Sequence, residues 1–187
     1  MHPALLYLPG DRLTLPELAA ARIDGHVVEV GDGYMPADTV EGADARASSI
    51  AARVPDRMGV CGPTAAWVHG SGVSAPAPHH VRRIGGGRFR ASAPTVVVVH
   101  EPGLTAGDLT MIGGLAVATP VYVGMELALG AQTHPGHEGW LQALLSVMPE
   151  LGPELHHRLD ALHRRPGRTY ARRVLTRLAG AQEVVTR

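Results

Sequence analysis

The chain lacks lysine, has one cysteine and contains few aromatic residues, and each shortage narrows what the protein can be. All 17 of its basic residues are arginine, which is typical of a GC-rich genome and carries no chemistry by itself. A single cysteine, Cys61, excludes an intramolecular disulfide and a cysteine-rich zinc site, so we expect a reducing cytoplasm. Two Trp, four Tyr and one Phe leave a core built mostly from Val, Leu and Ala.

Long hydrophobic runs are also missing. No segment approaches about 18 uninterrupted apolar residues, so we expect no membrane-spanning helix. The first residues carry no basic segment followed by an apolar one, and we therefore predict no signal peptide. With 45% hydrophobic residues among 187, the chain can bury a sizeable core in one moderate domain with a small appendage.

Charge is balanced overall but unevenly distributed. The formal net charge is zero, yet residues 1–60 carry five Arg against nine acidic residues, and residues 151–187 carry eight Arg against three. A neutral total argues against a strong general nucleic-acid binder, because phosphate neutralisation supplies most non-specific affinity. The basic C-terminal end keeps local contact with nucleic acid open.

Residues 1–40 predict a small helix–hairpin module. Thr14 precedes Pro16 and Glu17 as the cap of a short helix. Strands over His26–Val30 and Tyr34–Met35 are joined by a tight glycine turn. A helix followed by such a hairpin is typical of the end of a winged helix. Because no earlier helices and no separate recognition helix are evident, we expect a reduced winged-helix-like module.

Residues 41–187 predict a larger α+β domain with a mixed sheet and a helical C-terminal third. Its expected elements are helices over 44–53 and 64–70, a short strand or the entry to a helix over 58–61, and a strand, loop and strand over 81–90. Apolar residues at helical spacing then predict helices over 139–148, 153–162 and 170–178.

The stretch between Thr95 and Ala128 is the most informative. Four valines at 96–99 predict a strand buried on both faces, which Pro102 and Gly103 end.

A hairpin and a capped helix follow that strand. Residues 109–112 and 115–118 predict two strands joined at Gly113-Gly114. Thr119 then caps a helix whose first residue is Pro120.

This order of elements resembles the AbiEi family of type IV antitoxins. The matching residues are His100 at the strand end, the segment Leu104–Asp108, and the turn Gly114–Pro120 with the helix behind it. Thr64–Gly70 is similar to the family's Ser-Ala-Ala-x-Leu-x-Gly helix. Pro166-Gly167-Arg168 before an Arg-rich helix also recurs among relatives of the family.

The resemblance covers most of residues 14–178 and implies an antitoxin-like binding protein. Such a protein neutralises a nucleotidyltransferase-type toxin, regulates its own operon, or does both. The chain departs from the family after Pro120, where Arg-Thr and then Asp are usual and Tyr122-Val123 and Glu126 stand instead. We therefore expect the ion pair that Arg and Asp would form in this helix to be lost.

Two other functions stay open. The first is a stand-alone DNA-binding transcriptional regulator. The second is an enzyme, whose least implausible form is a metal-dependent hydrolase using His134 and His137. The toxin itself is excluded, because its Gly-Ser is followed by an Asp-x-Asp pair and Gly70-Ser71 is not.

No residue pattern predicts a catalytic site, a metal or a cofactor. His134 and His137 flank Pro135-Gly136 in an expected loop, where no cysteine or firmly placed carboxylate joins them, and the adjacent His156 and His157 point to different faces of a helix. Cys61 has no basic cluster to lower the pKa of its thiol, so we expect a buried small hydrophobe.

Two arginine groups are the candidate contact surfaces for nucleic acid or a partner protein. They are Arg82, Arg83, Arg88 and Arg90 on the expected hairpin, and Arg168, Arg172, Arg173 and Arg177 near the C-terminus. Guanidinium groups in such runs can reach phosphates or an acidic protein face. The alternative is a solvated helix or strand face.

Overall fold

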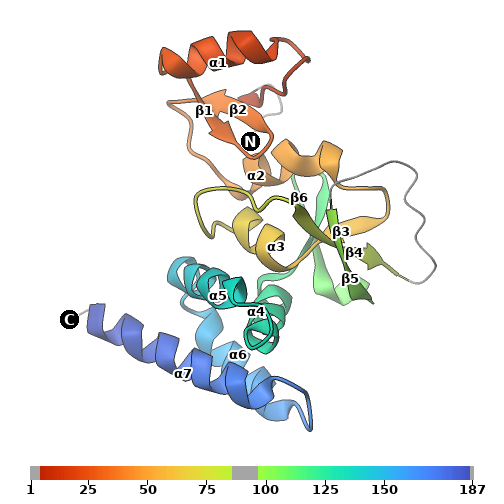
Figure 1. The fold of residues 1–187 in the computed structure, drawn as a ribbon, viewed down its shortest axis with the longest axis vertical. Coiled ribbons are helices and arrows are strands. Elements are labelled where there is room, and N and C mark those ends of the chain that lie inside the picture. The colour runs from red at the N-terminus through yellow and green to blue at the C-terminus, as the bar shows by residue number, and fades with distance from the viewer. Residues whose placement is uncertain (1–4, 86–96, 186–187) are drawn as a thin grey trace.

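The chain folds into three layers along its long axis (Figure 1). The computed structural model describes residues 5–85 and 97–185. A helix–hairpin module lies at one end, a five-stranded mixed sheet lies in the middle, and helices α4 to α7 lie at the other end. The predicted α+β class with a mixed sheet and a helical C-terminal third is confirmed.

The N-terminal module consists of α1 (Leu15–Ile23), β1 (Val27–Val30) and β2 (Gly33–Pro36). Helix α1 begins in a capping box, in which the Glu17 amide donates to Thr14 Oγ1 and the Thr14 amide donates to Glu17 Oε2 over 2.7 Å. This reciprocal pairing satisfies amides that the helix itself leaves open. The helix and hairpin therefore form at the predicted residues.

A small core of its own holds this module together. Leu18, Val27 and Tyr34 form a buried cluster separate from the main core. The hairpin turn lies close to α2 (Ala43–Ile50): Gly31 has φ +55°, and a Cβ there would come within 2.2 Å of Ser49 Oγ. Only glycine fits this turn at that distance.

The central sheet has the order β5-β4-β3-β7-β6. Its strands are β3 (Met58–Val60), β4 (His79–Ile84), β5 (Val97–Leu104), β6 (Leu109–Ile112) and β7 (Leu115–Ala118). Strand β3 is antiparallel to β4 and parallel to β7, whereas β4 and β5 are parallel. The mixed sheet leaves β5 and β6 at its two edges.

Strand β5 differs from its prediction in two respects. Its described part is half-buried, with Val99 41% exposed, because β5 is an edge strand and not a central one. The strand also continues through Pro102 and Gly103 to Leu104. Proline is tolerated there because the outer side of an edge strand needs no donor.

The elements after β5 match the prediction closely. A 3₁₀ turn over Ala106–Asp108 leads into the β6–β7 hairpin at the expected residues. Helix α4 (Pro120–Gly130) begins at Pro120, and the Tyr122 amide donates to the hydroxyl of its cap, Thr119.

Helix α4 is the centre of the helical layer. It packs against α3 (Gly62–Val68), α5 (Gly136–Val147), α6 (Leu151–Ala161) and α7 (Arg168–Val185). Helix α3 in turn touches β4 and β7, so it connects the sheet to this layer. Among the residues described, no helix combines the length and apolar character needed to cross a membrane.

Candidate functional site

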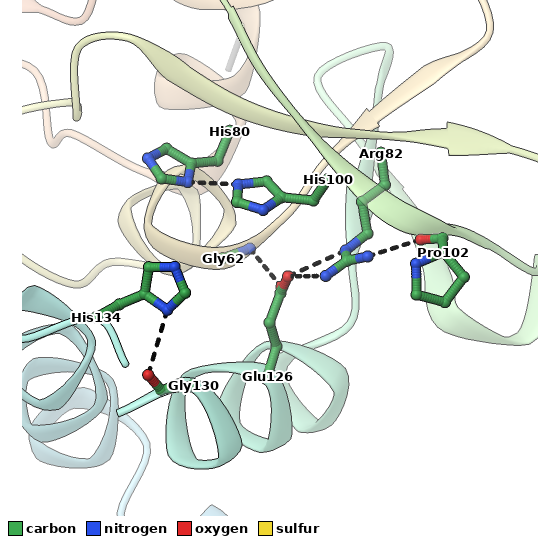
Figure 2. A network of polar contacts seen from close by, with 8 residues as sticks. All are labelled: Gly62, His80, Arg82, His100, Pro102, Glu126, Gly130 and His134. Carbon is green, nitrogen blue, oxygen red and sulfur yellow. Dashed lines mark hydrogen bonds and ion pairs between the residues drawn. The ribbon is translucent and has the colours of Figure 1, made fainter. Parts of the chain in front are cut away.

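A buried ion pair joins the sheet to the helical layer (Figure 2). Arg82 of β4 donates to Glu126 Oε1 of α4 through Nη2 at 2.6 Å and through Nε at 3.0 Å. The two side chains are only 10% and 12% exposed. The Arg82 Nη1 donates to the Pro102 carbonyl at 2.7 Å, and the Gly62 amide donates to Glu126 Oε2 at 2.8 Å.

These hydrogen bonds connect α3, β4, β5 and α4 through the side chains of Arg82 and Glu126. Burial opposes the charge of Arg82, but the adjacent Glu126 carboxylate outweighs it, so the pKa of Arg82 is raised. Both oxygens of Glu126 accept a hydrogen bond, and the charges compensate one another. We expected this helix to lack an ion pair, but Glu126 forms one with Arg82, which belongs to β4 and not to the helix.

Two histidines extend the cluster across the same face of the sheet. Alternation along β4 places His80 with Arg82, and the parallel register sets His100 of β5 opposite Arg82. His80 Nδ1 lies 2.9 Å from His100 Nε2, and the rings stack with centroids 5.0 Å apart. Because the two nitrogens share one hydrogen, one ring donates and the other accepts.

Burial disfavours the charged form of both imidazoles. It lowers the pKa of His80 to about 4, with the neighbouring His100 as the next cause. Burial also lowers the pKa of His100. At neutral pH the pair is therefore uncharged beside the compensated Arg82–Glu126 ion pair.

A second histidine pair lies where α4 meets α5. The rings of His134 and His137 stack with centroids 4.7 Å apart. His134 Nδ1 lies 3.4 Å from the Gly130 carbonyl, which can only accept (Figure 2). His137 is buried in the first turn of α5 and not in a loop as expected, and burial followed by His134 lowers its pKa.

These polar groups do not form a metal centre. In residues 5–85 and 97–185, no set of three or more His, Cys, Asp or Glu side chains is placed so that it could hold a metal ion. Cys61 is fully buried, and burial raises the pKa of its thiol, with Glu126 as the second cause. A protonated, inaccessible thiol is a packing group, as predicted for this cysteine.

Two open hollows run beside α4 and share Tyr122 and Met125. One, of about 450 Å³, has Arg82, Glu126 and Arg165 among its lining residues. The other, of about 400 Å³, is lined in part by Asp108. The ion pair therefore contributes to the lining of the first hollow.

The first predicted arginine surface is divided by the structure. Arg82 is buried in the ion pair, so its guanidinium is not available to phosphates. Arg83 points to the other face of β4 and pairs with Glu101 at 2.7 Å. Arg88 and Arg90 lie outside the described residues.

Three of the four arginines of the second surface form hydrogen bonds or ion pairs within the helical layer. Arg168 donates to the Leu159 carbonyl, Arg172 pairs with Asp160, and Arg177 pairs with Glu138. Arg173 is exposed.

Sequence reasoning missed the Arg82–Glu126 pair and the His80–His100 pair. The residues of each pair are separated by 44 and 20 positions, so their proximity depends on sheet register and helix docking. One signal was present: an acidic residue at position 126, inside an otherwise apolar helix, requires a buried partner.

The comparisons with known proteins give limited information. No family model matches the chain, and no curated protein matches it. Among solved structures, the chain is similar to the RV2827C protein from Mycobacterium tuberculosis, with 18% identity and a TM-score of 0.44. The match covers 88% of this chain and 64% of that protein, so the chain spans less than two thirds of its length. A likeness at this level assigns neither a family nor a function.

Proposed function

We propose that this chain is an antitoxin-like binding protein that acts in the cytoplasm by binding a nucleotidyltransferase-type toxin. The observation that carries the proposal is the β5–β7 segment with α4, whose residues resemble the AbiEi family and whose hairpin and cap lie at the residues carrying that resemblance. A helix–hairpin module precedes this domain, as a reduced winged helix would.

The Arg82–Glu126 pair is better suited to a structural role than to a catalytic one. A general acid or base must offer an atom to a substrate. Both carboxylate oxygens of Glu126 already accept hydrogen bonds, and Arg82 donates to Glu126 and to the Pro102 carbonyl. The pair therefore stabilises the contact between the sheet and α4.

A DNA-binding regulator is the second candidate, favoured by the excess of arginine over residues 151–187. The module that would enter a groove of DNA is unsuited to it, because residues 1–40 carry six acidic residues against two arginines. Like charges on protein and phosphate oppose binding.

Co-purification of the tagged full chain from its native host tests the proposal. We expect a stoichiometric nucleotidyltransferase with a Gly-Ser and Asp-x-Asp motif, and we expect co-expression of the two to relieve the growth arrest that the enzyme causes alone. Recovery of the chain with DNA that moderate salt releases, and without such an enzyme, would replace the proposal with the regulator.

A further inference from the structure

Exposed large hydrophobic side chains concentrate in the N-terminal module. Of the nine such side chains in the described residues, five lie between residues 5 and 40: Leu5, Leu15, Ile23, Val28 and Val40. Ile23 is 84% exposed and Leu15 is 55% exposed, although both belong to a regular helix. Single exposed hydrophobics are ordinary, but a concentration in one small module marks a contact surface.

Helix α1 is apolar on two opposite faces. Leu18 on the inner face is fully buried against the hairpin. The α1 outer face consists of Leu15, Pro16, Ala19, Ala20 and Ile23, all exposed, and the last four follow the i, i+3, i+4, i+7 spacing of one helix side. An apolar helix face is normally packed against another surface, and here only the Leu18 side is.

The position of α1 leaves that face available. Figure 1 shows the helix at the far end of the molecule, with the β1–β2 hairpin between it and the rest of the chain. Within the described residues, nothing shields Ile23 from solvent. No part of the chain that the structure describes therefore covers the α1 outer face.

Charge around the face indicates what that molecule is. Exposed Glu17 and Asp24 flank it, whereas Glu29 on the neighbouring strand is paired with the exposed Arg22 at 3.5 Å. Residues 1–40 nevertheless carry six acidic residues against two arginines, so a second copy docked face to face would bring two acidic modules together, and DNA phosphates would be repelled in the same way. A protein surface bordered by arginine or lysine has the complementary charge.

We infer that the α1 outer face is the docking surface for a partner protein that presents an apolar patch rimmed by basic side chains. The inference rests on the proposed function, because it assigns toxin contact to the acidic module and not to the arginine groups. Ile23 and Leu15 are the apolar anchors, and Asp24 contributes to the acidic rim.

Site-specific photo-crosslinking of the full chain in its native host tests this surface. A benzoylphenylalanine residue replaces Ile23 in one variant and Val73, 92% exposed in a loop away from α1, in the control. Each is combined with Asp24→Arg or, as a matched charge reversal, Asp56→Arg, since both aspartates are exposed. An arginine at the C-terminus of α1 is compatible with the helix dipole, so Asp24→Arg should fold.

We expect position 23, but not position 73, to crosslink to one other protein, with Arg or Lys flanking the crosslinked peptide. Asp24→Arg should lower that yield at least tenfold, and Asp56→Arg should leave it unchanged. A crosslink to a second copy or to DNA, no crosslink at position 23, or a yield insensitive to Asp24→Arg would overturn the inference.

The same data separate this inference from the proposed function. If position 23 captures a protein that is not a nucleotidyltransferase, the docking surface stands and the antitoxin assignment fails. If a nucleotidyltransferase co-purifies but position 23 does not touch it, the assignment stands and toxin contact must lie elsewhere.

Discussion

Two adjacent arginines of β4 have different roles. Arg82 is buried and donates two hydrogen bonds to Glu126, whereas the partner of Arg83, Glu101, is 61% exposed. Removing one member of a buried pair leaves an uncompensated charge, while an exposed pair contributes little. Stability at this point of β4 therefore depends on position 82 far more than on position 83.

Substitution of the carboxylate should show this difference. We expect Glu126→Leu to lower the free energy of unfolding by about 3 kcal/mol or more, because Arg82 stays buried without its counter-charge. The double variant Arg82→Met with Glu126→Leu should recover most of the loss, and Arg83→Met should cost less than about 1 kcal/mol. Urea denaturation measures all three variants, and equal losses in Glu126→Leu and Arg83→Met would contradict the buried-pair explanation.

The buried histidines predict a loss of stability in mild acid. Burial lowers the pKa of His80 to about 4, and it also lowers that of His69, His100 and His137, below the ordinary value of 6.5. Protons then bind the unfolded chain more readily than the folded one. Stability should be fully present above about pH 6.5 and should fall as the pH drops toward 4.

The urea midpoint at pH 7 and at pH 5.5 measures this effect. In a His80→Gln variant, which keeps a group able to bond His100, the decrease between the two pH values should be smaller. A His157→Gln variant at an exposed position should retain the full decrease. A midpoint that rises on acidification would be inconsistent with neutral buried imidazoles.

At the scale of elements, glycine sets how closely the β6–β7 hairpin approaches α2. Gly113 has φ +55°, and a Cβ there would lie 2.6 Å from the Asp44 carbonyl oxygen and from Ser48 Oγ. Its neighbour Gly114 has φ +80° and open space around it. Both positions share the backbone cost of a left-handed conformation, but only Gly113 is also confined by contact.

Two alanine variants separate these costs. We expect Gly114→Ala to lose about 1 to 2 kcal/mol from its backbone conformation alone. Gly113→Ala should lose more, because Asp44 and Ser48 must also move. Thermal or urea unfolding provides the comparison, and equal losses would mean that the hairpin moves away from α2 without cost.

Helix α1 should open independently of the sheet. The core that it shares with the hairpin is small, and the capping box at Thr14 is exposed. We expect Thr14→Ala to destabilise α1 by about 1 kcal/mol, with Thr14→Ser retaining most of the stability. Amide hydrogen exchange should be faster in α1 and unchanged in β3 and β7, whereas a uniform change would indicate that the module and sheet unfold together.

For the whole molecule, local sequence signals predicted which helices and strands form better than they predicted which of these elements pack together. The β6–β7 hairpin and α4 were predicted at the correct residues because Gly113-Gly114 and Thr119-Pro120 act on adjacent backbone. The prediction that β5 is buried on both faces was wrong, because four valines indicate a strand but not whether it lies at an edge of the sheet. The role of Arg82 was missed for the same reason, since its partner is brought to it only by the docking of α4.

The uneven charge of the molecule limits any contact with DNA. Several C-terminal arginines are engaged with Asp160, Glu138 or backbone carbonyls. Arg57, Arg164, Arg165 and Arg173 are exposed, and Arg88, Arg90 and Arg187 lie outside the described residues. If these seven arginines supply the phosphate contacts, the logarithm of the DNA-binding constant should fall against the logarithm of salt with a slope no steeper than about −6.3.

Fluorescence anisotropy with a random duplex at several salt concentrations measures that slope. Arg173→Ala should make it shallower by about one unit, because one phosphate contact is removed. Asp24→Arg should strengthen binding if DNA approaches the N-terminal module and should have no effect if it does not. A slope steeper than about −6.3 would require that arginines now held in ion pairs, such as those of α7, open on DNA, which would favour the regulator over the antitoxin.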